Sequence, residues 1–193
     1  SASPSLPLAY LTEDTGTNPM TAPNFCMLLR KHISGGRIVS ILQPEMERIL
    51  KFEIEHLNEL GDVCTKYLIV ELMGKHSNII FCRPDGTIID SIKHISLNIS
   101  SVREVLPGRS YFIPNTMLKQ NPLTITAAEF AEKVLSKPLP VGKALYTSLT
   151  GISPVIAEEI CFRASLDSGM STSGLSDVEK VHLFGVFSRL MED

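Results

Sequence analysis

The spacing of apolar residues changes once along this chain, near residue 122, and this change constrains the fold more than any other feature. Before it, apolar and polar residues alternate, as around Leu50, Phe52 and Ile54, which is the pattern of half-buried strands. After it, apolar residues recur at the helical period. We therefore expect an α+β fold, with an antiparallel β-rich lobe over residues 1–120 and a helical lobe over residues 121–193.

Turn and capping residues divide the two lobes further. A helix over residues 23–34 is expected to precede an antiparallel meander, and residues 111–113 are expected to form a short edge strand. The meander strands are expected at residues 37–40, 48–55, 63–73, 78–82 and 87–92. The third of these is apolar on both faces near its end, which predicts a central strand. In the second lobe, helices are expected to begin near Thr126, Val141, Ser153 and Ser176.

Composition and charge exclude several classes of protein. The 193 residues are 44% hydrophobic and 20% charged, which excludes disordered and collagen-like chains. No apolar run approaches the roughly 18–20 residues that span a bilayer. Lys+Arg and Asp+Glu number 12 each over residues 1–120, and 6 and 9 over residues 121–193. The net charge of −3 excludes a broadly basic nucleic-acid arm, so any electropositive site must come from local clustering.

The cysteines point to a reducing compartment. Cys26, Cys64, Cys82 and Cys161 are too far apart for a C-x-x-C pair and are expected to be buried free thiols. Free thiols favour the cytoplasm. Residues 1–7 lack the basic and apolar regions of a signal peptide, and the chain is expected to be a fragment of a longer protein.

The common signatures of enzymes and metal sites are missing from the sequence. None of the five histidines forms an H-x-x-x-H or H-E-x-x-H pair, and there is no Gly-rich phosphate loop or G-x-S-x-G elbow. We therefore expect no metal, no cofactor and no catalytic residue, in a protein that is not an enzyme.

Two polar positions in the first lobe are candidates for anion binding. The donors of residues 74–78 fit an anion-facing turn, and equally a solvated hairpin loop in which Asn78 bonds its own backbone. Arg48 is expected to begin a strand, and alternation places it on the same face as Leu50, Phe52 and Ile54. Its planar guanidinium suits phosphate, and the alternative is a salt-bridged strand end.

A third candidate lies in the second lobe. Residues 141–164 read as a short helix, a tight turn and a capped helix, which resembles a helix-hairpin-helix motif. The turn of that motif points backbone N–H groups at a nucleic-acid phosphate. Gly151 and Ser153 stand where the motif has two glycines, and they are the candidate phosphate contacts. The alternative is an αα-hairpin that only packs.

Five sequence blocks resemble one known family. They are NFCMLLRKHISGG at 24–36, NELGD at 58–62, LIVELMGKHSNII at 68–80, DSIKHI at 90–95, and LPG at 106–108 followed by Tyr111. In this order they resemble the N-terminal domain of the NFACT family, whose bacterial members are often labelled fibronectin-binding protein A. The resemblance covers nearly the whole chain.

The resemblance implies both a fold and a function. It implies a β-rich lobe similar to the N-terminal lobe of formamidopyrimidine-DNA glycosylases, followed by helix-hairpin-helix elements. It implies a tRNA- and large-ribosomal-subunit-binding domain of a ribosome-associated quality control factor, which binds a subunit obstructed by peptidyl-tRNA and promotes alanine tailing of the stalled chain. It also implies a coiled coil and a small RNA-binding domain after this one, and a helix, strands and an acidic residue upstream of Ser1.

The resemblance further implies site residues. The Asp-Arg pair that the family needs for tRNA handling corresponds to Glu47 and Arg48. The family's Arg-His-Ser-Asn loop corresponds to Lys75, His76, Ser77 and Asn78. Two other functions stay open. One is a fibronectin-binding adhesin that reaches the cell surface without a signal peptide. The other is an enzyme acting on nucleic-acid bases, by analogy of fold alone.

Overall fold

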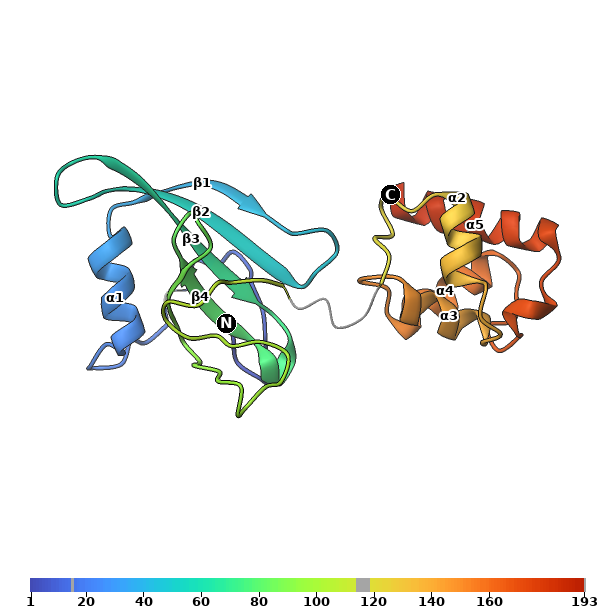
Figure 1. Cartoon of the computed structure of the whole chain (residues 1–193), viewed down its shortest axis with the longest axis horizontal. Coiled ribbons are helices and arrows are strands. Elements are labelled where there is room, and N and C mark those ends of the chain that lie inside the picture. Colours follow the sequence, from blue (N-terminus) through green and yellow to red (C-terminus); the bar gives the residue numbers. More distant parts are fainter. Residues whose placement is uncertain (15, 114–118, 193) are drawn as a thin grey trace. The chain divides into compact units, whose positions relative to one another are not determined.

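The chain consists of two compact units. The computed structural model describes residues 1–14, 16–113 and 119–192. The sheet unit comprises Ser1–Pro44 and Arg48–Thr116, and the helical unit comprises Glu45–Glu47 and Met117–Asp193 (Figure 1). The domain division after residue 120 that the sequence indicated remains a proposal.

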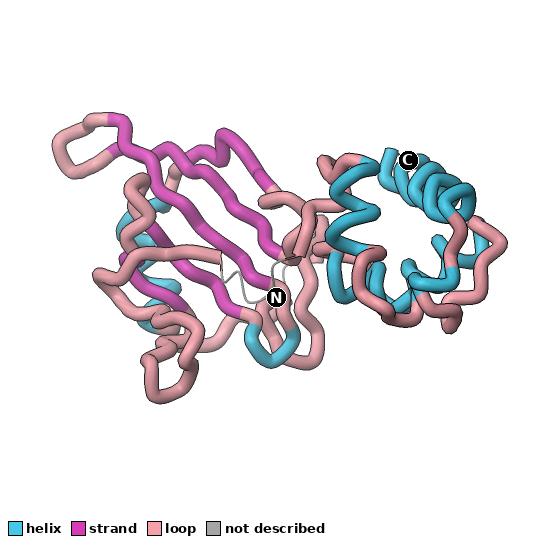
Figure 2. Tube along the Cα trace, turned by 45° about the vertical axis from the view of Figure 1, so that its right-hand side comes forward, coloured by secondary structure: helices cyan, strands magenta, loops and turns pink. Residues whose placement is uncertain are grey.

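The sheet unit holds one antiparallel sheet of five strands, in the order β1-β2-β3-β4-β5. Helix α1 (Asn24–Ile33) precedes the sheet. The strands are β1 (Arg37–Leu42), β2 (Ile49–Leu57), β3 (Val63–Glu71), β4 (Asn78–Cys82) and β5 (Ile88–Ser91). Figure 2 shows them side by side. The central position of β3 agrees with its two apolar faces.

The bounds of the strands differ from the sequence-based expectation by one or two residues, and β2 runs on to Leu57. β1 continues to Leu42, with a bulge between Ile38 and Ser40. β3 ends at Glu71, because the chain then turns into the short 3-10 helix η1 (Gly74–His76). Residues 111–113 form no strand. Instead, the Tyr111 N–H donates to the Gly86 carbonyl at 2.8 Å and ties this segment to the β4–β5 turn.

Different segments cover the two faces of the sheet. Cross-strand pairing places Ile49, Ile69 and Ile80 on one face, where they are buried under the segment that follows β5. Val105 of that segment is fully buried against them. This face therefore carries the deeper apolar core of the unit.

α1 lies on the opposite face. The rings of His32 and Phe81 are 5.9 Å apart, and a Cβ on Gly36 would approach the Ile54 side chain to 3.0 Å. Leu50 and Phe52, on this face, are only half-buried. The alternation of residues 50–54 correctly indicated an apolar face. It did not reveal the deeper core on the other side, because that core depends on Val105, 51 residues after Ile54, folding over it.

The helical unit packs its helices around one core. Its elements are α2 (Ala127–Glu129), the π-helical turn η2 (Phe130–Val134), α3 (Val141–Ser148), α4 (Pro154–Arg163), the 3-10 turn η3 (Thr172–Gly174) and α5 (Asp177–Glu192). Thr126 and Glu129 form the predicted capping box by reciprocal hydrogen bonds. Ser176 and Glu179 form the second one at the start of α5. The α+β expectation, an antiparallel sheet followed by helices, is confirmed.

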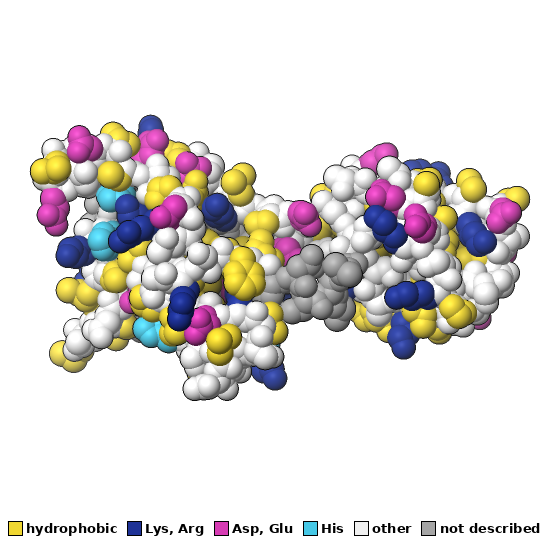
Figure 3. All heavy atoms as spheres, in the orientation of Figure 1, with side chains coloured by type: hydrophobic (Ala, Val, Ile, Leu, Met, Phe, Trp, Pro, Cys, Tyr) yellow, Lys and Arg dark blue, Asp and Glu magenta, His cyan; other side chains and the backbone are white. Residues whose placement is uncertain are grey.

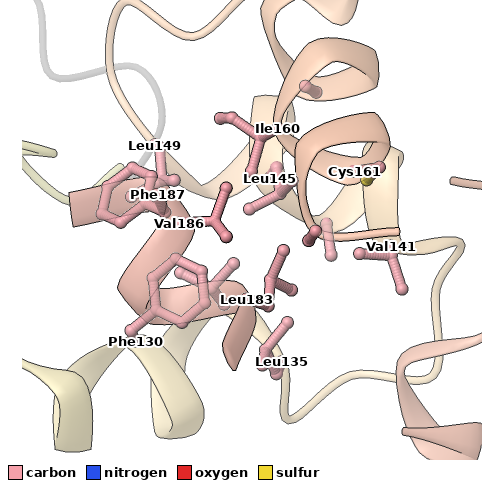
Figure 4. Close-up of a cluster of buried hydrophobic side chains, with 14 of the residues drawn as sticks. Phe130, Leu135, Val141, Leu145, Leu149, Ile160, Cys161, Leu183, Val186 and Phe187 are labelled. Atoms are coloured by element: carbon pink, nitrogen blue, oxygen red, sulfur yellow. The ribbon is translucent and has the colours of Figure 1, made fainter. Parts of the chain in front are cut away.

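Buried side chains from every long helix of this unit meet in its centre. Phe130, Leu145, Leu183 and Phe187 are at most 1% exposed and point toward one another in Figure 4. The ring centroids of Phe130 and Phe187 are 5.0 Å apart. The period of 3.6 in this part of the sequence thus corresponds to helix faces that share one core.

The cysteines are all free thiols. Cys82 and Cys161 are buried, and burial raises the pKa of their thiols to about 12 and about 11. Cys26 and Cys64 are only half-buried, so the expectation of four buried thiols holds for two of them. Among the described residues, no helix is long and apolar enough to cross a membrane.

Candidate nucleic-acid interface

Arg48 lies at the end of the sheet where β3 turns into its loop. Ile49 pairs with Glu71, and the ladder continues as the Leu72 N–H donates to the Arg48 carbonyl at 2.8 Å. The Arg48 side chain is exposed and lines a pocket of about 350 Å³ together with Leu50 and Leu72. The fold therefore brings Arg48 beside Leu72, where the loop over residues 72–78 begins. The sequence could only treat this loop as a separate candidate.

The loop over residues 72–78 is a compact turn. Gly74 adopts a left-handed conformation with φ of +56°, which a side chain would strain. The Ser77 N–H donates to the Gly74 carbonyl at 3.0 Å, and the Ser77 hydroxyl accepts from the Met73 N–H at 2.9 Å. Lys75 and His76 at its apex are exposed, whereas Ser77 is fully buried. The turn thus presents two cation-forming side chains to solvent on a fixed backbone.

Asn78 clamps this loop to a distant segment. Its amide nitrogen donates to the Lys93 carbonyl at 2.9 Å, and its amide oxygen accepts from the Lys93 N–H at 3.0 Å. The oxygen also accepts from the Ile79 N–H at 2.9 Å. Asn78 is fully buried. Its side chain is therefore engaged within the protein and holds the loop in place.

Lys93 is a site residue that sequence reasoning missed. Its ammonium group donates to the Lys75 carbonyl at 3.3 Å, so a further positive charge lies at the same loop. The sequence did contain a signal, because Lys93 belongs to the DSIKHI block at residues 90–95. Nothing local, however, connected that block to Asn78.

A buried ion pair supports the same end of the sheet. Glu71 is fully buried, and its carboxylate accepts hydrogen bonds from the Arg103 guanidinium and, at 2.9 Å, from the Tyr111 hydroxyl. Arg103 also donates to the Phe112 carbonyl at 2.8 Å. Burial, together with the Glu71 charge, raises the pKa of Tyr111 well above its usual range, so this hydroxyl stays a donor. These contacts fix the last residue of β3, from which the loop begins.

The remaining predicted contacts are placed as follows. Glu47 precedes Arg48 and is half-buried, but it is grouped with the helical unit. Gly151 has φ of +74° in the turn between α3 and α4, and it is exposed. The Ser153 hydroxyl accepts from the Ile156 N–H at 3.2 Å, so it serves as the N-cap of α4. An αα-hairpin is therefore present, and whether its turn binds phosphate remains a proposal.

No metal cluster of histidine, cysteine or carboxylate groups occurs among residues 1–14, 16–113 and 119–192. The exposed Arg48, Lys75 and His76 at the end of the sheet are cationic or can become so, which suits an anionic partner. Arg48, Lys75 and His76 are exposed near this end of the sheet, and Asn78 and Lys93 hold the turn that carries Lys75 and His76. We name these three residues the anion-facing surface, and anion binding by it remains a prediction.

The fold and this surface place the chain in a class of α+β proteins with an antiparallel sheet followed by a helical unit. The sequence model of one family, described as "NFACT N-terminal and middle domains", matches residues 1–193. The chain belongs to this NFACT family, as the five sequence blocks indicated.

Known proteins agree with this assignment. The chain is 40% identical over 167 residues to the protein named Rqc2 homolog RqcH of Bacillus subtilis, covering 86% of this chain and 29% of that protein. It is 30% identical over 190 residues to the archaeal Rqc2 homolog aRqcH of Methanocaldococcus jannaschii, covering 95% and 26%. The chain thus spans less than a third of the length of these relatives.

A solved structure has the same fold. It is the N-terminal part of the fibronectin/fibrinogen-binding protein from Streptococcus suis, with a TM-score of 0.76 and 32% identity. The match covers 97% of this chain and 66% of that one.

Proposed function

We propose that this chain is the tRNA- and large-ribosomal-subunit-binding domain of a ribosome-associated quality control factor that promotes alanine tailing of stalled nascent chains. The relatives named Rqc2 homologues support the general role. The observation that carries the proposal is the exposed Arg48, whose backbone pairs with Leu72, two residues before the turn that presents Lys75 and His76. In this proposal the domain is non-catalytic, needs no cofactor and acts in the cytoplasm.

The site residues have different roles in this proposal. Arg48, Lys75 and His76 contact RNA phosphates, because their side chains are exposed and positive or able to become so. Ser77 and Asn78 position the turn, because their polar groups are already bonded within the protein. Glu47 acts with Arg48 as the acidic member of the pair in tRNA handling, and the backbone around Gly151 and Ser153 supplies a further phosphate contact.

Replacing Arg48 tests the proposal directly. We expect Arg48→Ala to weaken tRNA binding by the full-length protein about tenfold, since a charged hydrogen bond contributes about 1.5 kcal/mol or more. Arg48→Lys should recover only part of this, because an ammonium lacks the planar fork. Filter binding over a range of salt concentrations measures both effects.

The matched control is Arg109→Ala, which removes an exposed arginine paired with Glu104 in the same unit. It should leave tRNA binding within about twofold. Unchanged tRNA binding and unchanged tailing in Arg48→Ala would remove Arg48 from the site.

A fibronectin-binding adhesin is the second candidate, and the name of the Streptococcus suis neighbour favours it. Fractionation of intact cells separates the two functions. A protein found with ribosomes supports the quality control role, and one found at the cell surface that binds immobilised fibronectin supports the adhesin.

A further inference from the structure

A second pocket lies at the other end of the sheet from Arg48. Its volume is about 600 Å³, and it lies between the end of α1, the β2–β3 turn and the end of β4. His56 lines it, eight residues along β2 from Arg48, which is about 26 Å at the usual strand rise. The pocket is thus a separate site in the sheet unit.

Positive groups from several elements converge on this pocket. The lining residues that are cationic or can become so are Lys31, His32, His56, Lys66 and Arg83. Figure 3 shows histidine and Lys or Arg side chains gathered over the region between α1 and the β2–β3 turn. Glu59 is the acidic residue among those that line it. The pocket therefore has a strong excess of positive charge in a unit that is balanced overall.

The lysine and arginine side chains of the pocket are not held in ion pairs, although Glu59 lines the pocket and the charge of Arg83 acts on the nearby Asp85. In the part of the chain that the structure describes, Lys31, Lys66 and Arg83 form no ion pair. Lys31 complements the negative end of the α1 dipole, which gives it a structural reason to be there. Lys66 comes from β3, and Arg83 directly follows β4.

The two histidines add independent observations. The Nδ1 of His56 lies 3.1 Å from the Leu57 carbonyl, and its Nε2 is buried without a hydrogen-bond partner among the described residues. Buried polar atoms normally have a partner, so this nitrogen is an exception at the wall of the pocket. The pKa of His32 is lowered, first by burial and then by the charges of Lys31, Lys66, His56 and Arg83. The positive charges of the pocket thus disfavour the protonated form of His32.

We propose that this pocket binds a phosphate group, with Lys66 and Arg83 as its principal counter-ions, Lys31 completing the charge, and His56 as a hydrogen-bond partner. Phosphate fits because it accepts several charged hydrogen bonds at once. The phosphate can belong to an RNA backbone or to a small phosphorylated molecule. The inference uses none of the residues assigned to the proposed function, so it stands or fails independently of Arg48.

The first measurement uses inorganic phosphate as the probe. NMR of the histidine ring signals follows His32 and His56 over a pH titration, once with phosphate and once with chloride at matched ionic strength as the reference. Bound phosphate should raise the pKa of His32, because an anion offsets the surrounding positive charge. Arg83→Ala and Lys66→Ala should each weaken phosphate binding about tenfold.

A control variant separates this site from general charge effects. Arg109→Ala removes a cation of the same unit outside the pocket. It should leave the phosphate response unchanged. If phosphate shifts neither histidine more than chloride does, or if Arg83→Ala and Lys66→Ala bind phosphate as the unchanged chain does, the proposal is wrong.

The source of the phosphate is decided by competition. A single-stranded RNA oligonucleotide that displaces phosphate, and loses this ability in Arg83→Ala, identifies the RNA backbone. If phosphate binds and the oligonucleotide does not displace it, the site takes a small phosphorylated molecule.

Discussion

Glu71 determines much of the geometry at the exposed end of the sheet, although no part of it reaches solvent. Its partner Arg103 is 32 residues further along the chain, and the Tyr111 hydroxyl binds the same carboxylate. A buried charge without its partner is costly, so the pair holds residues 103–113 against the sheet. Glu71 also pairs with Ile49, the first residue of β2. It therefore fixes the strand end that Arg48 directly precedes.

Removing the charge of Glu71 should therefore destabilise the protein strongly. Glu71→Gln leaves Arg103, whose side chain is 10% exposed, without a counter-charge. We expect the free energy of unfolding to fall by about 3 kcal/mol in urea denaturation. Glu104→Gln is the matched control, because its partner Arg109 is 61% exposed, and it should change the free energy of unfolding by less than about 1 kcal/mol. Equal effects of the two changes would contradict this account.

At the scale of elements, the local sequence predicts the start of α4 in the α3–α4 hairpin better than its end. Ser153 caps α4 and Pro154 is its first residue, as expected. The end of α4 is less regular. Ser165 adopts a left-handed conformation with φ of +56°, and the Leu166 N–H donates to the Cys161 carbonyl at 2.9 Å. This is the closing pattern in which glycine is preferred.

Replacing Ser165 with glycine should stabilise the helical unit. Ser165→Gly relieves the left-handed strain, and we expect the free energy of unfolding to rise by about 0.5–1 kcal/mol, visible as a higher Tm. Ser165→Ala keeps the strain and should give no gain. A Tm that falls in Ser165→Gly would show that the serine side chain itself stabilises the turn.

At the scale of the whole molecule, the chain has two separate cores. Ile49, Ile69 and Ile80 belong to the core of the sheet unit, and Phe130 and Leu183 belong to that of the helical unit. Each core belongs to a different compact unit of the chain. The anion-facing surface around Arg48 and the basic pocket around Arg83 both lie in the sheet unit.

A cavity in the core of one unit should lower mainly the stability of that unit. Leu183→Ala removes a fully buried side chain, and we expect it to lower the stability of the helical unit by about 3 kcal/mol. Hydrogen exchange should accelerate in α3, α4 and α5, while β2 and β3 keep their protection. Equal acceleration in both units would show that they unfold as one.

The sequence by itself determined the features that depend on neighbouring residues. Strand alternation, the turn at Gly74, and the caps at Thr126, Ser153 and Ser176 are each specified within a few positions, so the order and class of the elements could be predicted. The five sequence blocks likewise indicated the family. The likeness to the glycosylase lobe and phosphate binding by the α3–α4 turn remain predictions.

Only the tertiary structure decided which distant residues meet. Asn78 binds Lys93, Glu71 binds Arg103, and Lys66 and Arg83 line one pocket with Lys31. The deeper face of the sheet likewise depends on Val105 folding over Ile49. These contacts join residues 15 or more positions apart, and they form only when whole elements pack. A local sequence pattern predicts the strand to which a residue belongs and the face on which its side chain lies. Its distant contact partner is decided only by how the elements pack in the folded protein.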